Sequence, residues 1–468
     1  MIYLASVFFI LFLYLSLRRF ELAVAFLIAA LPSYLIRFKI FGFPTTILEL
    51  MILIVFFVWL KNNYAWIKKS LGGRLTKEEK NSKHAYLFQN EIIALIIISF
   101  FAVGVADFSN AAFGVWKAYF FEPLLLYIVV LNVLIKKEEN NTVNKIILWP
   151  LLFSAFAVAI LAFYQKITGN LIDNPLWAAA ATRRVVSFFG YPNAVGLYLG
   201  PLILFFVGWL VNRRIENKKW QINDLFIFVV VFLSLLAIIF AKSVGASLGV
   251  FVGLVVFCLM IGKRSFAITI SILLFSLISI FSFSYSQDIA IKYLTLNDFS
   301  GQVRKIGWVD SWHMLSDGRL ITGAGLTGFQ GAVSRYHTPG FFYNKDNDPD
   351  FRRKIVIFDE NYKNKYWQPL EVYLYPHNIF LNFWSELGLF GMLLFAWIIG
   401  RFFYLCFKIR KVAKDKFIVI GLLSAVVVIV VHGLVDVPYF KNDLAAIFWI
   451  FLAIISYFKI YDFEKFTK

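Results

Sequence analysis

The chain has 468 residues, of which 60% are hydrophobic, and a formal net charge of +18; its mean hydropathy is +0.74. These values exclude an ordinary soluble domain, in which roughly 45–50% of residues are apolar, and indicate an integral membrane protein. The excess of Lys and Arg lies mainly in short loops between apolar runs. This distribution does not argue for nucleic-acid binding.

Apolar runs that fit membrane helices recur from end to end of the chain. A bilayer core requires about 20 apolar residues per helix, with a range of roughly 17–25. The sequence therefore predicts an all-α, polytopic membrane protein with about 12 or 13 transmembrane helices, the lower count arising because the first two runs are short and nearly continuous. The expected spans are 2–17, 21–36, 45–60, 92–107, 118–135, 146–163, 194–211, 224–241, 244–261, 266–284, 378–400, 417–432 and 442–459.

The chain divides into three parts on this basis. Residues 1–284 form the N-terminal transmembrane helices, 285–376 form one large polar loop, and 377–468 form the C-terminal helices. Short loops rich in Lys and Arg occur at 61–91, 136–137, 213–219, 263–264 and 401–416. Placing these loops in the cytoplasm makes the alternation of spans consistent, with the C-terminus inside and the large loop outside. The first apolar run ends at Arg18-Arg19 without a small-residue cleavage site, so we expect an anchor and no cleaved signal.

Cationic side chains on the expected outer side mark the first candidate sites. Arg184 ends an outer loop, and Pro192-Asn193 then begins a span, where proline is well placed. Lys242 lies in a tight turn between two spans. Each has a plain structural explanation, with Arg184 at the lipid headgroups and Lys242 extending toward water. The alternative is that both present positive charge to an anion, since arginine offers paired donors to phosphate.

The large loop holds 11 basic and 10 acidic residues, so an anion site there depends on local geometry and not on bulk charge. Arg304 and Trp308 are followed by a glycine-rich stretch, 323–329, whose amides could form an anion-binding nest or a turn that packs on the tryptophans. No clear strand precedes the stretch, so it does not match a dinucleotide-binding fingerprint.

The polar segment Tyr375-Pro376-His377-Asn378 ends the large loop and begins an apolar helix that contains Glu386. Ionisable groups are costly at a membrane boundary unless they function or are paired. A histidine there can act as a base or as a phosphate donor, or it can cap the helix. Further on, His432 and Asp436 are four residues apart and share a helical face, which suggests a structural pair.

The sequence does not predict a metal site. Asp346, Asp348 and Asp350 alternate like the start of a calcium loop, but Phe351 and Ile357 stand where that motif requires glycine and glutamate. The five histidines and two cysteines of the chain lack metal-ligand spacing. No cofactor is expected.

Taken in order, these clusters resemble the superfamily of bacterial O-antigen ligases and O-antigen polymerases, polytopic membrane glycosyltransferases of a GT-C-like architecture. The resemblance covers about residues 182–445. The matching positions are Arg184 before Gly190–Asn193, Ser243–Ala246 for the turn Ser-Arg-Gly-Ala, Arg304 and Trp308 before Gly323, Gly325 and Gly328, His377-Asn378 before Glu386 and Gly388, and His432 with Asp436. One position departs, because the family's arginine in the short turn is Val244 here; Lys242 could supply the charge, as a point charge without the planar fork.

The resemblance implies an enzyme of the bacterial cytoplasmic membrane, with its active site on the outer face and no metal requirement. The donor would be a glycan on undecaprenyl diphosphate, and an acceptor hydroxyl would attack the anomeric carbon. Arg304, Lys242 and Arg184 would bind the diphosphate, and His377 would activate the acceptor or bind the diphosphate. Asn378, Glu386, Trp308, Asn193 and Asp436 would orient these groups.

The resemblance leaves the acceptor open. A ligase would transfer to lipid A-core in lipopolysaccharide biosynthesis, a polymerase would extend a carrier-linked glycan, and a protein-glycosylating enzyme is a third version. A transporter of polysaccharide lipids is the alternative from another class. It predicts charges in the middle of spans and paired broken helices, whereas the ionisable residues here gather at the outer ends of helices and in one loop.

Overall fold

The computed structural model describes residues 2–40, 43–71, 87–136, 142–217, 219–282, 284–357 and 360–460. Within these ranges nearly all regular structure is helical, and the strands form two short two-stranded antiparallel sheets. One pairs β1 (Arg37–Ile40) with β2 (Phe43–Thr46), and the other pairs β3 (Gly340–Phe342) with β4 (Trp367–Pro369). The predicted all-α polytopic class is confirmed. Parts of the basic loops, at 72–86, 137 and 218, lie outside the described residues.

The helices follow the predicted apolar runs. Those before the large loop are α1 (Ile2–Arg18), α2 (Phe20–Ala29), η1 (Leu31–Leu35), α3 (Ile47–Leu71), α5 (Gln89–Val105), α6 (Asn110–Trp116), η2 (Lys117–Phe121), α7 (Glu122–Lys136), η3 (Asn144–Leu148), α8 (Trp149–Thr168), α9 (Pro175–Ala178), α10 (Pro192–Glu216), α11 (Ile222–Ala241), α12 (Val244–Ile261) and α13 (Lys263–Ser282). The loop contains α14 (Ser284–Leu294), α15 (Phe299–Ser316), α16 (Phe329–Val333), η4 (Ser334–Tyr336), α17 (Phe351–Val356) and α18 (Glu360–Tyr366), and α19 (Ile379–Ile409), α20 (Lys416–Gly433) and α21 (Asn442–Phe458) follow it.

By length and composition, nine helical segments of the described chain can cross a membrane. They are Ile47–Tyr64, Asn110–Lys136, Asn144–Thr168, Pro192–Glu216, Ile222–Ala241, Val244–Ile261, Lys263–Ile280, Ile379–Ile409 and Lys416–Gly433. The four remaining predicted spans coincide with shorter apolar helices, Ser6–Arg18, Phe20–Ala29, Gln89–Val105 and Asn442–Phe458. Each predicted span therefore falls on an apolar helix, and four of these helices are shorter than the usual spanning length.

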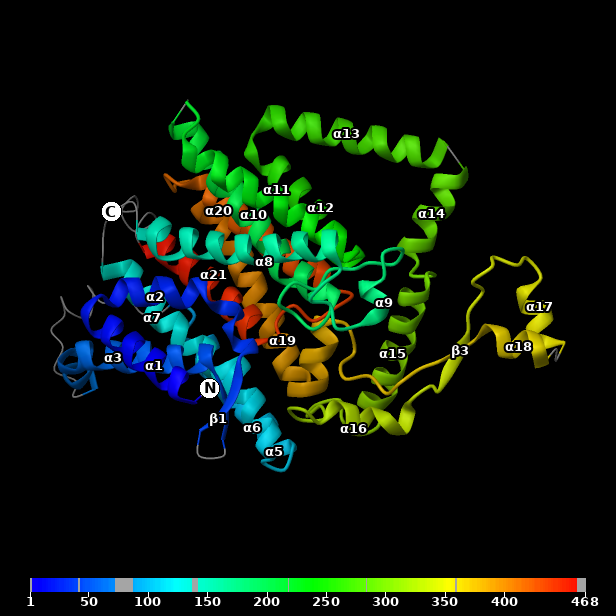
Figure 1. Ribbon diagram of the computed structural model, residues 1–468, viewed down its shortest axis with the longest axis horizontal. Helices are drawn as coiled ribbons and strands as arrows, with labels where there is room; N and C mark the ends of the chain where they lie inside the picture. The colour runs from blue at the N-terminus through cyan, green and yellow to red at the C-terminus, as the bar shows by residue number, and fades with distance from the viewer. Residues whose placement is uncertain are drawn as a thin grey trace.

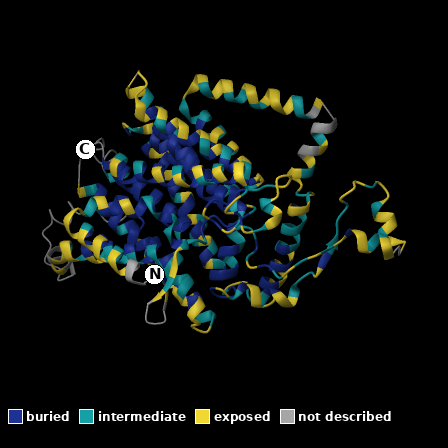
Figure 2. Ribbon diagram, viewed as in Figure 1, coloured by how far each residue is buried: buried dark blue, intermediate teal, exposed yellow. Residues whose placement is uncertain are grey.

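The bundle is organised around α10, α20 and α21. Helix α10 packs against α11, α12 and α20, and α21 packs against α7. Because α10 and α21 are apolar on all sides, they are buried all round, and Trp209 and Trp449 are fully covered. Helix α13 is different, since none of its apolar window is buried, and it runs along the edge of the bundle (Figure 2). Its exposed apolar side chains suit contact with lipid.

The large loop is helical in part and lies at one side of the molecule. In Figure 1, α15, α16, α17 and α18 lie on the right, and the C-terminal end of the chain lies on the left. Within this loop, the 18 residues of α15 form a regular helix that begins after Asp298, whose side chain caps the helix by accepting from the amide of Gly301. This helix carries Arg304 toward the bundle.

Helix α19 is broken at Gly388. The backbone there has φ +77°, a left-handed conformation that breaks the helical run. A Cβ atom at this position would lie 2.0 Å from the carbonyl oxygen of Ile321. The amide of Leu389, released by the break, donates instead to that same oxygen at 3.1 Å. The break therefore fixes the glycine-rich stretch of the large loop against the membrane helix.

Glycine at 388 is consequently predicted to be required for stability. Gly388→Ala should lower the free energy of unfolding by at least about 1–3 kcal/mol, because it adds a strained left-handed residue and a steric clash with the Ile321 carbonyl. The measurement is the thermal unfolding midpoint in detergent. Gly400→Ala is the matched control, since it lies in the same helix with nothing within 4 Å of its added Cβ, and it should be neutral or slightly stabilising. Equal midpoints for the two variants would contradict this account.

Candidate active site

Polar side chains from five distant segments meet beside the start of α10. They come from the loop before α10, the turn between α11 and α12, helix α15, the segment before α19, and residues 434–441 after α20. Sequence order gave no indication of this convergence, which results from the packing of α10 against α12 and α20. The cluster lies on the side of the molecule where the large loop is found (Figure 1).

The buried carboxylate of Asp436 is the centre of the cluster. Its Oδ2 accepts from Asn193 Nδ2 at 3.2 Å, and its Oδ1 accepts from the amide of Val437 at 2.9 Å. His377 Nδ1 lies 4.0 Å from the same Oδ1 and has no hydrogen-bond partner within the described ranges. Asp436 therefore faces the histidine without closing a hydrogen bond, and the imidazole nitrogen is left free.

Arg304 is held by neutral groups. Its Nε donates to the carbonyl oxygen of Val435 at 2.8 Å, and its Nη1 donates to Ser300 Oγ at 2.8 Å. No carboxylate of the described residues forms an ion pair with it. Since Val435 precedes Asp436, this contact places the guanidinium beside His377, and its charge acts on that side chain.

Arg184 is held in the same manner. Its Nε donates to the carbonyl oxygen of Ala241 at 2.9 Å, and Nη2 contacts Asn193 Oδ1 at 3.3 Å and the Lys242 carbonyl at 3.5 Å. Burial lowers the pKa of this arginine. Its neighbour Arg183 has another role, since it donates to the carbonyls of Lys166 and Ile167 at the end of α8. Of the two adjacent arginines, only Arg184 reaches the cluster.

The side chain of Lys242 lies at the margin of the cluster. The residue ends α11 with φ 52°, is exposed, and places Nζ 3.4 Å from the carbonyl oxygen of Thr182. Val244 is also exposed, at the start of α12. Gly245 in this turn packs so closely on His432 that a Cβ would lie 2.8 Å from Cδ2 of the imidazole. Glycine is therefore required at this position by packing.

His377 is constrained by its backbone and by its neighbours. Its φ of 49° is uncommon for a residue with a side chain, and its ring lies 4.5 Å from that of Tyr375, centroid to centroid. Burial lowers the pKa of His377, the charge of Asp436 raises it, and that of Arg304 lowers it further. The net direction is downward, so the imidazole is neutral at neutral pH and can accept a proton.

Two tyrosines of the cluster were not predicted from the sequence. Each precedes a proline near the start of a membrane helix: Tyr191 precedes Pro192, the first residue of α10, and Tyr375 precedes Pro376, three residues before α19 begins. Burial raises the pKa of both phenols, and the nearby Asp436 carboxylate adds to the increase. The ammonium of Lys441 lies 5.7 Å from the ring centroid of Tyr191. The repeated Tyr-Pro pair before a span was the signal that could have identified them.

Asn378, Glu386 and Trp308 were expected to orient the site, and each has different neighbours in the structure. Asn378 caps α19 by accepting from the amides of Phe380 and Leu381, and its Nδ2 donates to the Leu434 carbonyl at 3.2 Å. Glu386 instead accepts from the amide of Thr327 at 2.6 Å. Trp308 is half-buried on α15, one turn after Arg304, with an indole N–H that has no partner among the described groups.

Most amides of the glycine-rich stretch donate within the protein, those of Gly323, Ala324, Leu326, Thr327 and Gly328 among them. The amide of Ala324 donates to the Ser385 carbonyl at 2.7 Å, and that of Leu326 donates to the Ala102 carbonyl at 3.1 Å. Gly323 and Gly325 have positive φ and approach the backbone of α19 and α5 too closely for a side chain. The stretch is therefore a docking segment, and the nest considered from the sequence is not formed by these amides.

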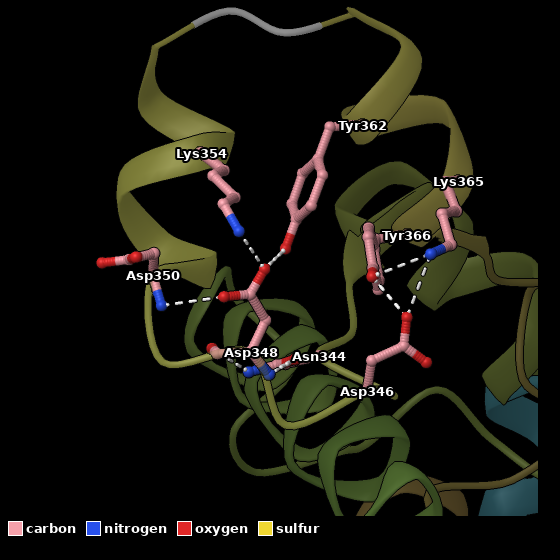
Figure 3. A network of polar contacts seen from close by, with 8 residues as sticks. All are labelled: Asn344, Asp346, Asp348, Asp350, Lys354, Tyr362, Lys365 and Tyr366. Atoms are coloured by element: carbon pink, nitrogen blue, oxygen red, sulfur yellow. Dashed lines mark hydrogen bonds and ion pairs between the residues drawn. The ribbon is translucent and has the colours of Figure 1, made fainter.

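The alternating aspartates form an ion-pair network (Figure 3). Asp348 Oδ2 accepts from Lys354 Nζ and from the Tyr362 hydroxyl, each at 2.6 Å, and Lys354 lowers the pKa of this carboxyl to about 2. Asp346 is bound by Lys365 and Tyr366. In the described part of the chain, no three His, Cys, Asp or Glu side chains are grouped so that they could hold a metal ion. The network ties α17 and α18 together.

Together these observations define a multi-pass membrane protein with a positively charged polar site between its bundle and its large loop. Residues 229–396 match the model of the O-antigen ligase family, which confirms the resemblance to the O-antigen ligase and polymerase superfamily. Members of this family are glycosyltransferase-like enzymes of the bacterial inner membrane. The match includes Lys242, Arg304 and His377 and ends before Asp436. No curated protein matches the chain.

The charges around His377 lead to a prediction about its titration. In protein labelled at histidine, NMR should show a His377 pKa below its ordinary value of about 6.5. Arg304→Gln should raise this pKa, because it removes a cation that disfavours the imidazolium, and Asp436→Asn should lower it. Arg335→Gln, on an exposed arginine of the same loop, should leave it unchanged. A pKa that does not respond to either site variant would remove both groups from the surroundings of His377.

Proposed function

We propose that the protein transfers a glycan from undecaprenyl diphosphate to an acceptor hydroxyl at the outer face of the cytoplasmic membrane. The observation that carries this proposal is the pair of guanidiniums of Arg184 and Arg304. Both are oriented by neutral oxygens and have no carboxylate partner in the described chain. Arg304 acts on His377, and Arg184 is joined through Asn193 to Asp436, which faces that histidine. Positive charge arranged in this way is available to a phosphate-bearing substrate.

The arginines would stabilise the leaving group. When the anomeric carbon–oxygen bond breaks, the electron pair remains on the diphosphate, whose negative charge grows in the transition state. Donors that are already oriented stabilise that charge without reorganising. The bonds from Nε to the Val435 and Ala241 carbonyls fix each guanidinium and leave other N–H groups free to bind oxygen.

His377 would accept the proton of the acceptor. The hydroxyl oxygen attacks the anomeric carbon, the glycosidic bond forms, and the hydroxyl proton moves to a neutral imidazole nitrogen. The lowered pKa keeps His377 in the neutral form that this step needs. Asp436, 4.0 Å away, favours the imidazolium that results. Asn193 bridges Asp436 to Arg184 and would orient both.

The transfer reaction itself is the decisive test. Purified protein in detergent is given an undecaprenyl-diphosphate glycan, with EDTA present, and either lipid A-core or no added acceptor. Wild type should form product, Arg304→Gln should lose about 10²–10³-fold in rate, and His377→Ala should lose about 10²–10⁴-fold. Arg335→Gln is the matched control, with an arginine lost from the same loop but away from the cluster.

The products distinguish the versions of this function. Coupling to lipid A-core identifies a ligase, and longer carrier-linked chains formed from the donor alone identify a polymerase. In a parallel reaction without EDTA, product that forms there but not with EDTA would contradict a metal-independent reaction. Absence of product from folded wild-type protein with either acceptor would count against transfer to these acceptors and favour a transporter or another acceptor. Full activity in both site variants would show that neither Arg304 nor His377 takes part in the transfer reaction.

A separate prediction concerns the position where the family has arginine. If Lys242 supplies that charge, Lys242→Ala should reduce transfer roughly 10- to 100-fold, the value of one hydrogen bond to a charged group. Adding Val244→Arg to this variant should restore most of the rate, since the exposed Val244 begins the neighbouring helix. Lys263→Ala, at the other end of α12, is the control. An unchanged rate in Lys242→Ala would remove Lys242 from the site.

A further inference from the structure

A second polar region lies at the other end of α19 from His377. A pocket of about 700 Å³ opens there, formed mostly by the last part of α19 and closed by Leu87 and Lys459 from two other segments. Leu87 precedes α5, and Lys459 follows α21. The pocket therefore lies where three helix ends meet, and none of its lining residues belongs to the candidate active site.

One face of α19 supplies both the apolar wall and the charge. Trp397, Arg401, Tyr404 and Lys408 all line the pocket and recur three or four residues apart, so their side chains lie in one stripe. Trp397 and Tyr404 are exposed aromatic residues near the end of a membrane helix. Aromatic rings followed by Lys and Arg at a helix end are typical of the level of the lipid headgroups.

Glu91 fixes the inner part of this pocket. This buried carboxylate accepts from the guanidinium of Arg401 and from Trp397 Nε1, the latter at 3.0 Å. The ion pair between Arg401 and Glu91 joins α19 to α5 and neutralises the arginine. It orients both pocket side chains, so that the wall is formed before a ligand arrives.

The remaining positive charge of the pocket is not neutralised. Lys408 extends over the ring of Tyr404, with Nζ 4.6 Å from the centroid, and Lys459 lines the same pocket. Neither lysine has an ion pair with a carboxylate in the part of the chain that the structure describes. The pocket thus combines an apolar, lipid-accessible wall with two unpaired ammonium groups at its margin.

We propose that this pocket binds an anionic phospholipid, with the phosphate between Lys408 and Lys459 and the acyl chains along Trp397 and the apolar surface of α19. Charge complementarity selects an anionic headgroup, and the aromatic wall selects a lipid over a free phosphate, which would leave that surface in water. The site is separate from the proposed transfer reaction and requires no step of it. It gives the protein a lipid-dependent anchor at the end of α19 that lies away from the large loop.

The test compares lipid binding by purified full-length protein in detergent, using native mass spectrometry with phosphatidylglycerol and phosphatidylcholine as probes. Wild type should retain phosphatidylglycerol in preference to phosphatidylcholine. Lys408→Gln/Lys459→Gln should weaken phosphatidylglycerol binding about 30-fold, which corresponds to about 2 kcal/mol for two lysines, and should leave phosphatidylcholine binding unchanged. Lys411→Gln/Lys414→Gln is the matched control, because it removes two exposed lysines from the turn after α19, outside the pocket.

Each outcome bears on the proposal directly. A selective loss in the pocket variant alone supports it. An equal loss in the control variant would show a general attraction of this face for anionic lipid and would overturn the pocket. Wild type without a preference for phosphatidylglycerol would overturn it as well. The unfolding midpoint of each variant confirms that the protein is folded, and transfer activity is assayed in parallel, so that failure of the lipid site is distinguished from failure of the proposed function.

Discussion

The buried carboxylate of Asp436 is the element on which the polar end of this membrane bundle depends. It binds Asn193, which contacts Arg184, and it faces His377, while the carbonyl of the preceding Val435 orients Arg304. A charge at this depth is expensive unless other charges or hydrogen bonds compensate it. One anion among two cations and a neutral imidazole leaves an excess of positive charge, and the fold maintains this excess without neutralising it.

Most predictions from the sequence rested on two patterns, the apolar runs and the family motif positions. The apolar runs predicted the positions of the helices, because the bilayer sets both their length and their composition. Hydropathy did not predict that four of these helices, α1, α2, α5 and α21, are shorter than the others. The motif positions Arg184, Arg304 and His377 are separated by up to about 190 positions in the chain, and the structure brings them into one polar cluster. What they contact was beyond sequence reasoning, since their partners include backbone carbonyls such as those of Val435 and Ala241, which any residue provides.

Two expectations about the site depend on contacts that only the folded structure defines. The glycine-rich stretch allowed either an anion nest or a turn packed on the tryptophans, and the amides of Ala324 and Leu326 are used by the backbone of α19 and α5. Glu386 suggested an orienting group near His377, and its carboxylate instead binds the amide of Thr327. In both cases the residue type was informative and the partner was set by tertiary packing. The large loop between the membrane helices itself contains a regular helix, α15.

The docking of residues 321–327 on α5 and α19 also bears on how such a protein can change over evolution. The large loop is joined to the membrane helices through backbone hydrogen bonds and through glycines that admit no side chain. It is therefore not a module that could be exchanged between related proteins as a unit, even though it is continuous in sequence. A loop inherited from a relative would need the matching break at Gly388 and the matching end of α5, so the loop would vary more readily by substitutions on α15 to α18 than by recombination of the whole segment.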